Sequence, residues 1–276
     1  MAGPSVKHLD LADLAIEESS DVDSDFAQSQ KALNQKKRAM KDSPEARLKK
    51  VFPFRFVPLV KPLTISDLDS AVALENAAFT NPEHRASADK IAYRLTVCGE
   101  LSLGVFCTVV PSELNGWHIE TLDTAREVET GRYNGALNVL VAHIVGTKCI
   151  GETITDKDMA IPEDWRTRKG KPADVGHQEV GTTVAIHSLA VSPKLQGCRI
   201  GQLIIKAFLQ QMFGSGVVDR VSLLCQEHLV AYYVRCGFEN KGPSDAQFGG
   251  GGWYNMVFTF KRSRGPPGDA EMQPLP

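Results

Sequence analysis

One stretch of this sequence constrains the fold more than any other: an apolar segment, a short glycine-bearing loop and a long apolar segment at residues 182–212. TTVAIHSLAV (182–191) predicts a strand, and SPKLQGCRIG (192–201) predicts a turn-like loop. From Ile200 to Met212 the apolar residues recur at the spacing of one helix face, which predicts a helix. A strand that leads through a tight loop into a helix is typical of α/β proteins, in which the helix packs on the sheet.

The other predicted elements extend the same pattern. Two helices are expected first, at 64–79 and 86–98. Strands are expected at 101–110, 138–149, 220–226 and 253–260, with a short helix within 228–238. This order predicts an α/β fold built around one mixed sheet.

Several stretches lie outside these elements. Residues 1–50 are expected to form a disordered charged tail, because acidic residues gather in its first half and basic residues in its second. This tail is also a candidate arm for docking a regulatory partner. The folded domain is expected to span 51–262, with polar insertions at 111–136 and 150–180 and a mobile Pro/Gly-rich tail at 263–276.

The composition argues against several classes of function. The formal net charge is −2, whereas a general nucleic-acid binder carries a basic excess, so no nucleic-acid partner is expected. No apolar run approaches about 18 residues, and the first residues do not form a signal pattern. We therefore expect no membrane partner and a cytoplasmic location. The 6 cysteines are scattered without a C-x-x-C pair and the histidines lack ligand spacing, so neither a disulfide framework nor a bound metal is expected.

The loop before the predicted 201–212 helix has the chemistry of an anion site. Backbone N–H groups at a helix start have no acceptor within the helix, and the helix dipole adds positive potential there. Gly197 and Gly201 let a phosphate approach the backbone closely, and Arg199 adds charge. The loop lacks the Gly-Lys-Ser/Thr ending of a P-loop and does not match G-x-G-x-x-G. Taken by itself, it is more typical of an ordinary strand-to-helix connection.

The motifs around this loop resemble a known family. The run H-S-L-A-V-x4-Q-x-x-R-x-G at 187–201, followed by A-Y-Y-x-x-x-G-F at 231–238, resembles the GNAT superfamily of acyl-CoA-dependent N-acyltransferases. Residues 95–106 are similar to the L-T-L-C-P-E-L-S-L-G-W-F segment of its arylalkylamine (serotonin) N-acetyltransferase branch. Residues 139–147 are similar to the third strand of that branch. Its closing segment is matched by Gly242, Pro243, Gly249 and Met256. The resemblance covers roughly residues 55–260, apart from the two insertions.

The resemblance implies a GNAT fold: a mixed, mostly antiparallel central sheet with splayed parallel strands and flanking helices. Acetyl-CoA is implied as the co-substrate, lying between the splayed strands with its pantetheine arm along the backbone of Leu189, Ala190 and Val191. The Leu189 N–H would face the thioester oxygen, where negative charge grows during attack. The diphosphate would be held by the loop and the residue after it, namely Gln196, Gly197, Cys198, Arg199, Ile200, Gly201 and Gln202.

The same resemblance implies two catalytic side chains. An alkylammonium, with a pKa of about 10.4, must lose a proton before it attacks a thioester, and His187 is the expected base. Tyr233 aligns with the tyrosine that protonates the departing CoA thiolate. The structural alternatives are a satisfied core histidine and a tyrosine that only packs its helix. The amine pocket would be lined by Phe79, Thr147, Leu224, Phe248 and Trp253, for each of which core packing is the alternative.

Two positions depart from the family pattern. Arg199 stands where the family loop usually has its central glycine. If that position needs a positive φ, an arginine costs about 1 kcal/mol or more, although its guanidinium could instead contact a phosphate. Ala185 replaces the first of two histidines found in vertebrate members of the branch, so His187 would act alone.

These residues together predict an acetyl-CoA-dependent N-acetyltransferase that acetylates a small primary amine by direct attack in a ternary complex. Arylalkylamines such as serotonin or tryptamine are the first expected substrates, and polyamines are the second. One alternative is a GNAT enzyme that acetylates protein lysines or N-termini. Another is a non-catalytic acyl-CoA-binding module, a hypothesis that rests on Arg199 and Ala185.

Overall fold

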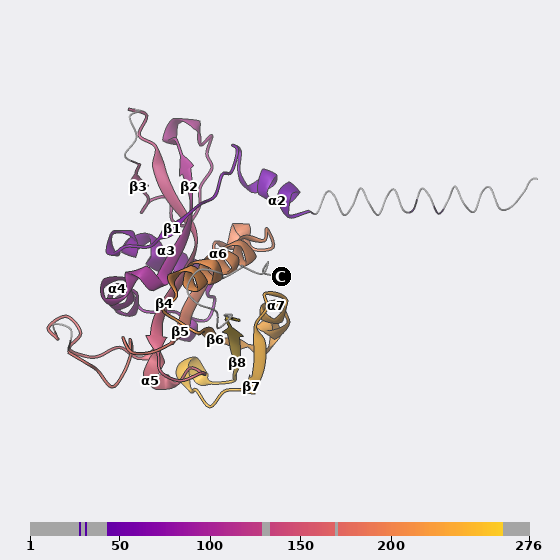
Figure 1. Cartoon of the computed structure of the whole chain (residues 1–276). Helices are drawn as coiled ribbons and strands as arrows, with labels where there is room; N and C mark the ends of the chain where they lie inside the picture. Colours follow the sequence, from indigo (N-terminus) through magenta and orange to yellow (C-terminus); the bar gives the residue numbers. More distant parts are fainter. Residues whose placement is uncertain (1–27, 29–30, 32–42, 129–132, 169–170, 262–276) are drawn as a thin grey trace, which may run out of the picture.

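A computed structural model describes residues 43–128, 133–168 and 171–261, together with Gln28 and Lys31. One sheet runs through these residues and has helices on both faces (Figure 1). Helices α3 (Leu68–Ala78) and α4 (Ala88–Val97) cover one face, and α6 (Ile200–Ser215) and α7 (Val230–Arg235) cover the other. None of the described helices is long and apolar enough to cross a membrane.

The sheet follows the order β1-β2-β4-β5-β6-β8-β7, and β3 pairs with β4 off this path. Its strands are β1 (Leu59–Pro62), β2 (Ser102–Val109), β3 (Arg126–Glu127), β4 (Leu137–Cys149), β5 (Thr183–Val191), β6 (Arg220–Gln226), β7 (Glu239–Pro243) and β8 (Trp253–Thr259). The pairing of β5 with β6 is parallel, and the other described pairings are antiparallel. This is the mixed, mostly antiparallel sheet that the sequence predicts.

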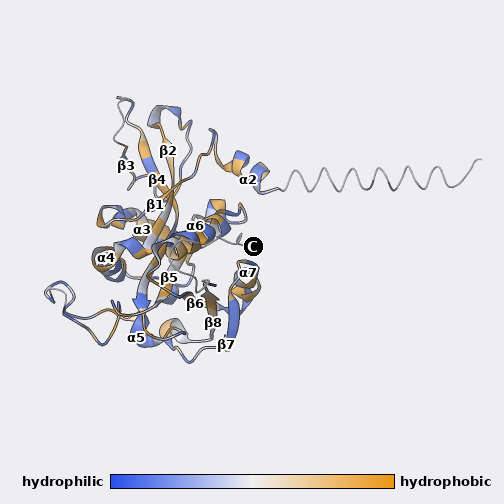
Figure 2. Ribbon diagram, viewed as in Figure 1, coloured by the Kyte–Doolittle hydropathy of each residue, from blue (hydrophilic) through white to orange (hydrophobic). Residues whose placement is uncertain are grey.

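The long helices form where the sequence places apolar residues at helical spacing. In α6, Ile204, Phe208 and Met212 are buried against the sheet, and the helix ends at Gly216 in the left-handed conformation. Helix α4 begins after Ser87, whose side chain accepts a hydrogen bond from the Lys90 N–H. Figure 2 shows hydrophobic residues along α6 and the central strands, and mostly hydrophilic residues on β7.

The parallel pair β5–β6 separates part of the way along. Its pairing runs from Thr183 opposite Arg220 to Ile186 opposite Leu223 and then stops. Beyond that point β5 continues to Val191 beside β4, and β6 continues to Gln226 beside β8. The two strands therefore stop pairing, as the resemblance implies, and we call the region beyond this point the strand split.

A β-bulge lies at the start of the strand split. Val145 of β4 pairs with Ser188, but the next residue, Gly146, pairs with Ile186, so His187 is an extra residue in β5. A Cβ at position 146 would lie 3.0 Å from the Ala185 carbonyl oxygen and 3.1 Å from that of Leu101. Glycine at position 146 therefore allows the strands to approach one another at the bulge.

Three elements differ from the sequence prediction. The 59–62 segment is predicted only as an extended lead-in, but it forms the edge strand β1. The sequence analysis assigns no element to residues 239–243, yet they form β7 against β8. Both strands are short and exposed, so neither carries the apolar pattern from which a strand is recognised.

Helix α2 (Pro44–Val51) is the third difference, because the sequence predicts a disordered tail as far as residue 50. Ser43 caps this helix by accepting a hydrogen bond from the Ala46 N–H, and Pro44 occupies its first turn. Leu48 and Val51 pack against the core cluster on the α6 face. The rest of the expected tail, except Gln28 and Lys31, lies outside the described residues, as does the 263–276 tail.

We predict that Gly146→Ala destabilises the protein. The new methyl group would meet two backbone oxygens at the bulge, and neither can move without shifting a strand, so we expect a loss of about 1–3 kcal/mol in the free energy of unfolding. Urea unfolding monitored by circular dichroism measures this change. Gly214→Ala in α6 is the matched control, because its Cβ would meet no atom within 4 Å and alanine favours helix. Equal unfolding midpoints for Gly146→Ala and the wild type would show that the bulge tolerates a side chain.

Candidate active site

In the strand split, one edge of β5 has no partner strand. Between His187 and Val191 this strand pairs with β4 on one side and has no partner strand on the other. The backbone here includes Leu189, Ala190 and Val191, the residues that the sequence assigns to the pantetheine arm. Leu189 and Val191 pack on the α6 side, whereas Ala190 is buried on the α3 side. The unpaired edge can therefore bond an extended ligand through its backbone.

The loop after β5 leads directly into the first turn of α6. The first backbone bond of the helix runs from the Leu203 N–H to the Arg199 carbonyl at 3.0 Å. The amides of Ile200, Gly201 and Gln202 therefore have no acceptor within the helix, and they form the positive end of its dipole. This geometry fits the anion site expected from the sequence.

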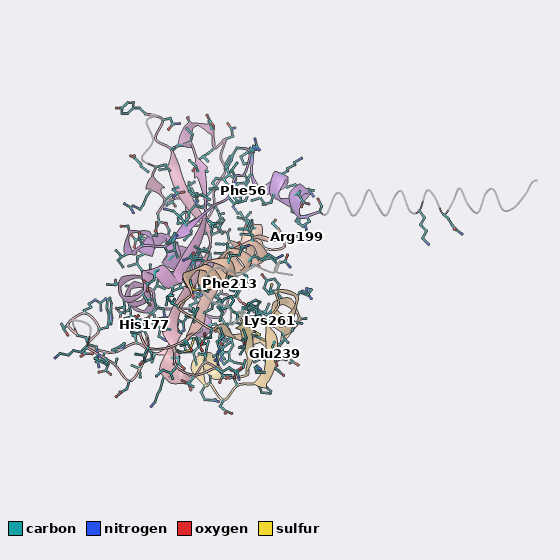
Figure 3. The ribbon with its side chains drawn as sticks, in the orientation of Figure 1. Phe56, His177, Arg199, Phe213, Glu239 and Lys261 are labelled. Atoms are coloured by element: carbon teal, nitrogen blue, oxygen red, sulfur yellow. The ribbon has the colours of Figure 1, made fainter. Side chains whose placement is uncertain are left out.

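Arg199, at the position expected to hold a glycine, adopts the left-handed conformation. Its φ is 63°, which for an arginine costs about 1 kcal/mol or more. Its side chain does not cap the helix and is exposed at the start of α6 (Figure 3). The exposed guanidinium interacts electrostatically with the Glu45 carboxylate of α2.

The other loop residues divide between exposed and buried positions. Gln196 and Gly197 are exposed, whereas Cys198 and Ile200 are buried in the core. A Cβ at Gly201 would lie 2.6 Å from the Tyr232 hydroxyl oxygen, so a side chain there would displace this tyrosine. Burial raises the pKa of Tyr232, which remains protonated.

His187 points to the α4 and α5 side of the sheet. Its Nε2 lies 2.7 Å from Thr147 Oγ1, and its Nδ1 lies 3.2 Å from the sulfur of Met159 at the end of α5 (Asp156–Met159). Because a thioether can only accept, Nδ1 carries the ring hydrogen in this arrangement and the Nε2 lone pair accepts from Thr147. The structure thus brings together two of the predicted site residues, His187 and Thr147.

The surroundings of His187 keep the imidazole neutral. Burial lowers the pKa of His187 well below its ordinary value of 6.5, and the cations of Arg94 and Lys90 lower it further. Both cations belong to α4. Burial also lowers the pKa of Arg94, to about 10, so its guanidinium remains charged at neutral pH. A neutral imidazole can accept a proton without first losing one.

Tyr233 lies on the opposite face of the sheet from His187. It is buried in the cluster formed with α6, and its ring meets the Phe238 ring edge-on at 5.8 Å. Burial raises the pKa of Tyr233 far above its ordinary value, so the phenol remains protonated. The resemblance implies that the His187 imidazole and the Tyr233 phenol both lie next to the thioester sulfur of acetyl-CoA. Since they occupy different faces, both could do so only if the sulfur lies within the strand split.

The predicted amine-pocket residues fall into two groups. Leu224 and Phe248 pack against the cluster that contains Met159 and Ala185, on the His187 side, and the rings of Phe248 and Trp253 stack at 6.4 Å. Phe79 packs instead with the cluster between α3 and α4. Near the first group, Lys90 Nζ lies 4.6 Å from the centre of the Phe248 ring.

A buried polar network supports the bulge, and the sequence does not predict it. Glu75 of α3 accepts hydrogen bonds from the Ser188 hydroxyl at 2.5 Å and the Ala86 N–H at 2.8 Å, and it lies 3.2 Å from His143 Nε2. Burial acts to raise the pKa of Glu75, but the hydrogen bonds from these three groups outweigh burial and lower it. The network ties the bulge residue Ser188 to α3. The available sequence signal was a glutamate within an apolar helix stripe and a histidine within an apolar strand.

Comparisons with known proteins show what this chain is similar to. Residues 159–238 match the Acetyltransferase (GNAT) family. A serotonin N-acetyltransferase from Mesocricetus auratus is 26% identical over 183 residues, which are 66% of this chain and 67% of that protein. The serotonin N-acetyltransferase of Macaca mulatta is 27% identical over 183 residues, 66% of this chain and 68% of that protein. A solved structure, the loading GNATL domain of CurA from Lyngbya majuscula, has a TM-score of 0.48 at 11% identity and covers 74% of this chain and 98% of its own.

We predict that Glu75 makes the stability of the protein depend on acidic pH. The pKa of Glu75 is lower in the folded state than the unfolded value of 4.5, so its stabilising contribution is complete above pH 4.5 and is lost as the pH falls through the folded pKa. Glu75→Gln should therefore show a smaller loss of unfolding free energy than the wild type between pH 4.5 and lower pH. Urea unfolding at several pH values measures the difference. The matched control is Glu113→Gln, at an exposed position. If Glu75→Gln and the wild type lose stability in parallel, Glu75 is not ionised in the native protein.

Proposed function

We propose that this chain, which carries an acetyltransferase domain of the GNAT family, transfers the acetyl group of acetyl-CoA to a small primary amine. The observation that carries this proposal is the strand split, which has an unpaired backbone edge, a neutral imidazole on one face and a protonated phenol on the other. An acyl thioester placed in the split would be within reach of both faces. Arylalkylamines are the proposed substrate class.

The coenzyme would lie along the unpaired edge of β5. Its diphosphate would accept hydrogen bonds from the amides of Ile200, Gly201 and Gln202, with charge added by Arg199. Its pantetheine arm would pair with the backbone between Leu189 and Val191. The Leu189 N–H would then polarise the thioester carbonyl and stabilise the oxyanion that forms on attack.

The chemical step would be a direct attack by the amine. The ammonium first loses a proton, which passes to His187 Nε2 either directly or through the Thr147 hydroxyl that lies 2.7 Å from it. The amine nitrogen then bonds to the carbonyl carbon and the C–S bond breaks. The departing thiolate takes the phenolic proton of Tyr233, and the second proton, which the nitrogen loses as the amide forms, restores the phenol. No covalent acyl-enzyme is needed, and the Cys225 thiol, whose pKa burial raises to about 11, plays no part.

The electrostatics beside His187 favour an arylalkylamine over a polyamine. The cations of Lys90 and Arg94 both act on this site, and they would repel an acceptor that carries several positive charges. The rings of Phe248 and Trp253 offer apolar contact to an aromatic amine. Acetylation of protein N-termini or lysines is the alternative that a substrate panel must test.

We predict acetyl-CoA-dependent thiol release with tryptamine or phenethylamine, and much less with spermidine or a lysine peptide. His187→Ala and Tyr233→Phe should each lower kcat by about 10²–10⁴-fold, because each removes one proton-transfer group. Mass spectrometry of the N-acetylated amine confirms the product. The control is His118→Ala, an exposed histidine far from β5 in sequence. A protein that binds acetyl-CoA but acetylates no amine or peptide would be a non-catalytic acyl-CoA-binding module.

We further predict a shift in the pH profile of Lys90→Gln. With a saturating amine, kcat should fall on the acid side only well below pH 6.5, because the pKa of His187 lies below that value. Removing the Lys90 cation favours the protonated imidazole, so this fall should move to higher pH. Lys157→Gln on α5 is the exposed control. An unchanged profile, or one shifted to lower pH, would exclude His187 as the base.

A further inference from the structure

The side chain of Lys90 lies among the aromatic residues that are proposed to bind the amine. Its Nζ is 4.6 Å from the centre of the Phe248 ring, which is the contact that a primary ammonium makes with an aromatic face. Phe248 is held in place, because its backbone N–H donates to the Asp156 carboxylate at 2.8 Å and its ring stacks with Trp253. Lys90 therefore presents a primary amine where the proposed acceptor would present its own.

Helix α4 places this amine on the side of the sheet where His187 lies. Lys90 and Arg94 are four residues apart, so they share one face of the helix. Arg94 donates a hydrogen bond to the Met159 carbonyl at 3.2 Å, and the Met159 sulfur lies 3.2 Å from His187 Nδ1. After burial and the Arg94 cation, the Lys90 cation is the third cause that lowers the pKa of His187. The face of α4 that carries Lys90 is thus close to the proposed base.

The Lys90 ammonium is not neutralised by the protein. Within the part of the chain that the structure describes, no carboxylate lies at ion-pair distance from its Nζ, and no hydrogen bond holds it. Partial burial lowers the pKa of Lys90, and the Arg94 cation lowers it further. The neutral amine, which is the nucleophilic form, is therefore easier to produce here than on an exposed lysine.

We propose that Lys90 is a self-acetylation site, whose Nζ attacks acetyl-CoA bound to the same chain when no amine substrate is present. The proposal rests on the proposed function, since it uses the same acyl donor and the same proton-transfer groups. The ammonium gives one proton to His187, and the neutral nitrogen bonds to the acetyl carbonyl carbon. The C–S bond breaks, the thiolate takes the phenolic proton of Tyr233, and the second nitrogen proton restores the phenol. The products are Nε-acetyl-Lys90 and free CoA, and His187 returns its proton to water.

Self-acetylation changes the acceptor site and ends after one transfer. It removes the positive charge of Lys90 and leaves an uncharged amide next to the Phe248 ring. An amide nitrogen is not a nucleophile toward a second thioester, so each chain takes up one acetyl group at this position. A small amine and the Lys90 side chain compete for the same thioester, so a bound amine protects Lys90.

Mass spectrometry of the full chain incubated with acetyl-CoA alone tests this proposal. The wild type should gain one acetyl group on the peptide that contains Lys90 and release an equal amount of CoA thiol. Lys90→Arg, which keeps a cation at this position, should gain none there. His187→Ala should slow the acetylation of Lys90 by about 10²-fold or more. The exposed Lys157 of α5 is the control within the same molecule for uncatalysed acetylation.

The outcomes separate this inference from the function on which it rests. A chain that acetylates tryptamine but leaves Lys90 unmodified would overturn this inference alone. Equal acetylation of Lys90 and Lys157, or a rate that His187→Ala does not slow, would show uncatalysed chemistry and overturn it as well. Saturating tryptamine should slow the modification of Lys90, and an unchanged rate would place Lys90 outside the acceptor site. Acetylation of Lys90 that requires His187, in a chain that acetylates no small amine, would support this inference and overturn the proposed small-amine activity.

Discussion

The loss of pairing between β5 and β6 is the constraint on which the rest of the structure depends. In a parallel pair that stays together, the backbone N–H and C=O groups between the strands bond to one another. Those groups are then not available to a ligand. Here the pairing ends at Ile186 and Leu223, and the extra residue at position 187 falls at that point. The bulge and the divergence together leave this part of β5 without a partner strand on one side.

Buried charges on the α3 and α4 face stabilise this arrangement. Glu75 holds Ser188 by a hydrogen bond, and the buried Arg94 donates to the Met159 carbonyl at 3.2 Å. The first contact joins α3 to the bulge in β5, and the second joins α4 to the end of α5. Burial first, and then the same Arg94 cation, lower the pKa of His187 and keep it neutral, so a group that holds α5 in position also affects the protonation state of the proposed base.

Helices α2 and α6 meet at the other end of the site. Helix α6 starts with a residue in the left-handed conformation, and this turn places three amides and Arg199 at one point. Helix α2 covers the loop and brings Arg47 to Gly197. The Glu45 carboxylate of α2 also interacts with Arg199, so α2 brings both a cation and an anion to the turn before α6.

The sequence by itself determined the main strands and long helices, because their apolar residues follow strand and helix periods. It also determined the position of the turn before α6, because Gly197, Arg199 and Gly201 follow a strand and precede a helix. Only the tertiary structure decided which groups meet. The bulge at His187 depends on Gly146 of another strand, and the opposite faces of His187 and Tyr233 depend on where α5 and α7 pack. The places of Glu75, Arg94 and α2 depend on partners that are distant along the chain. Periodicity reports a residue's local surroundings, whereas these contacts join segments whose separation in sequence carries no information about their distance in space.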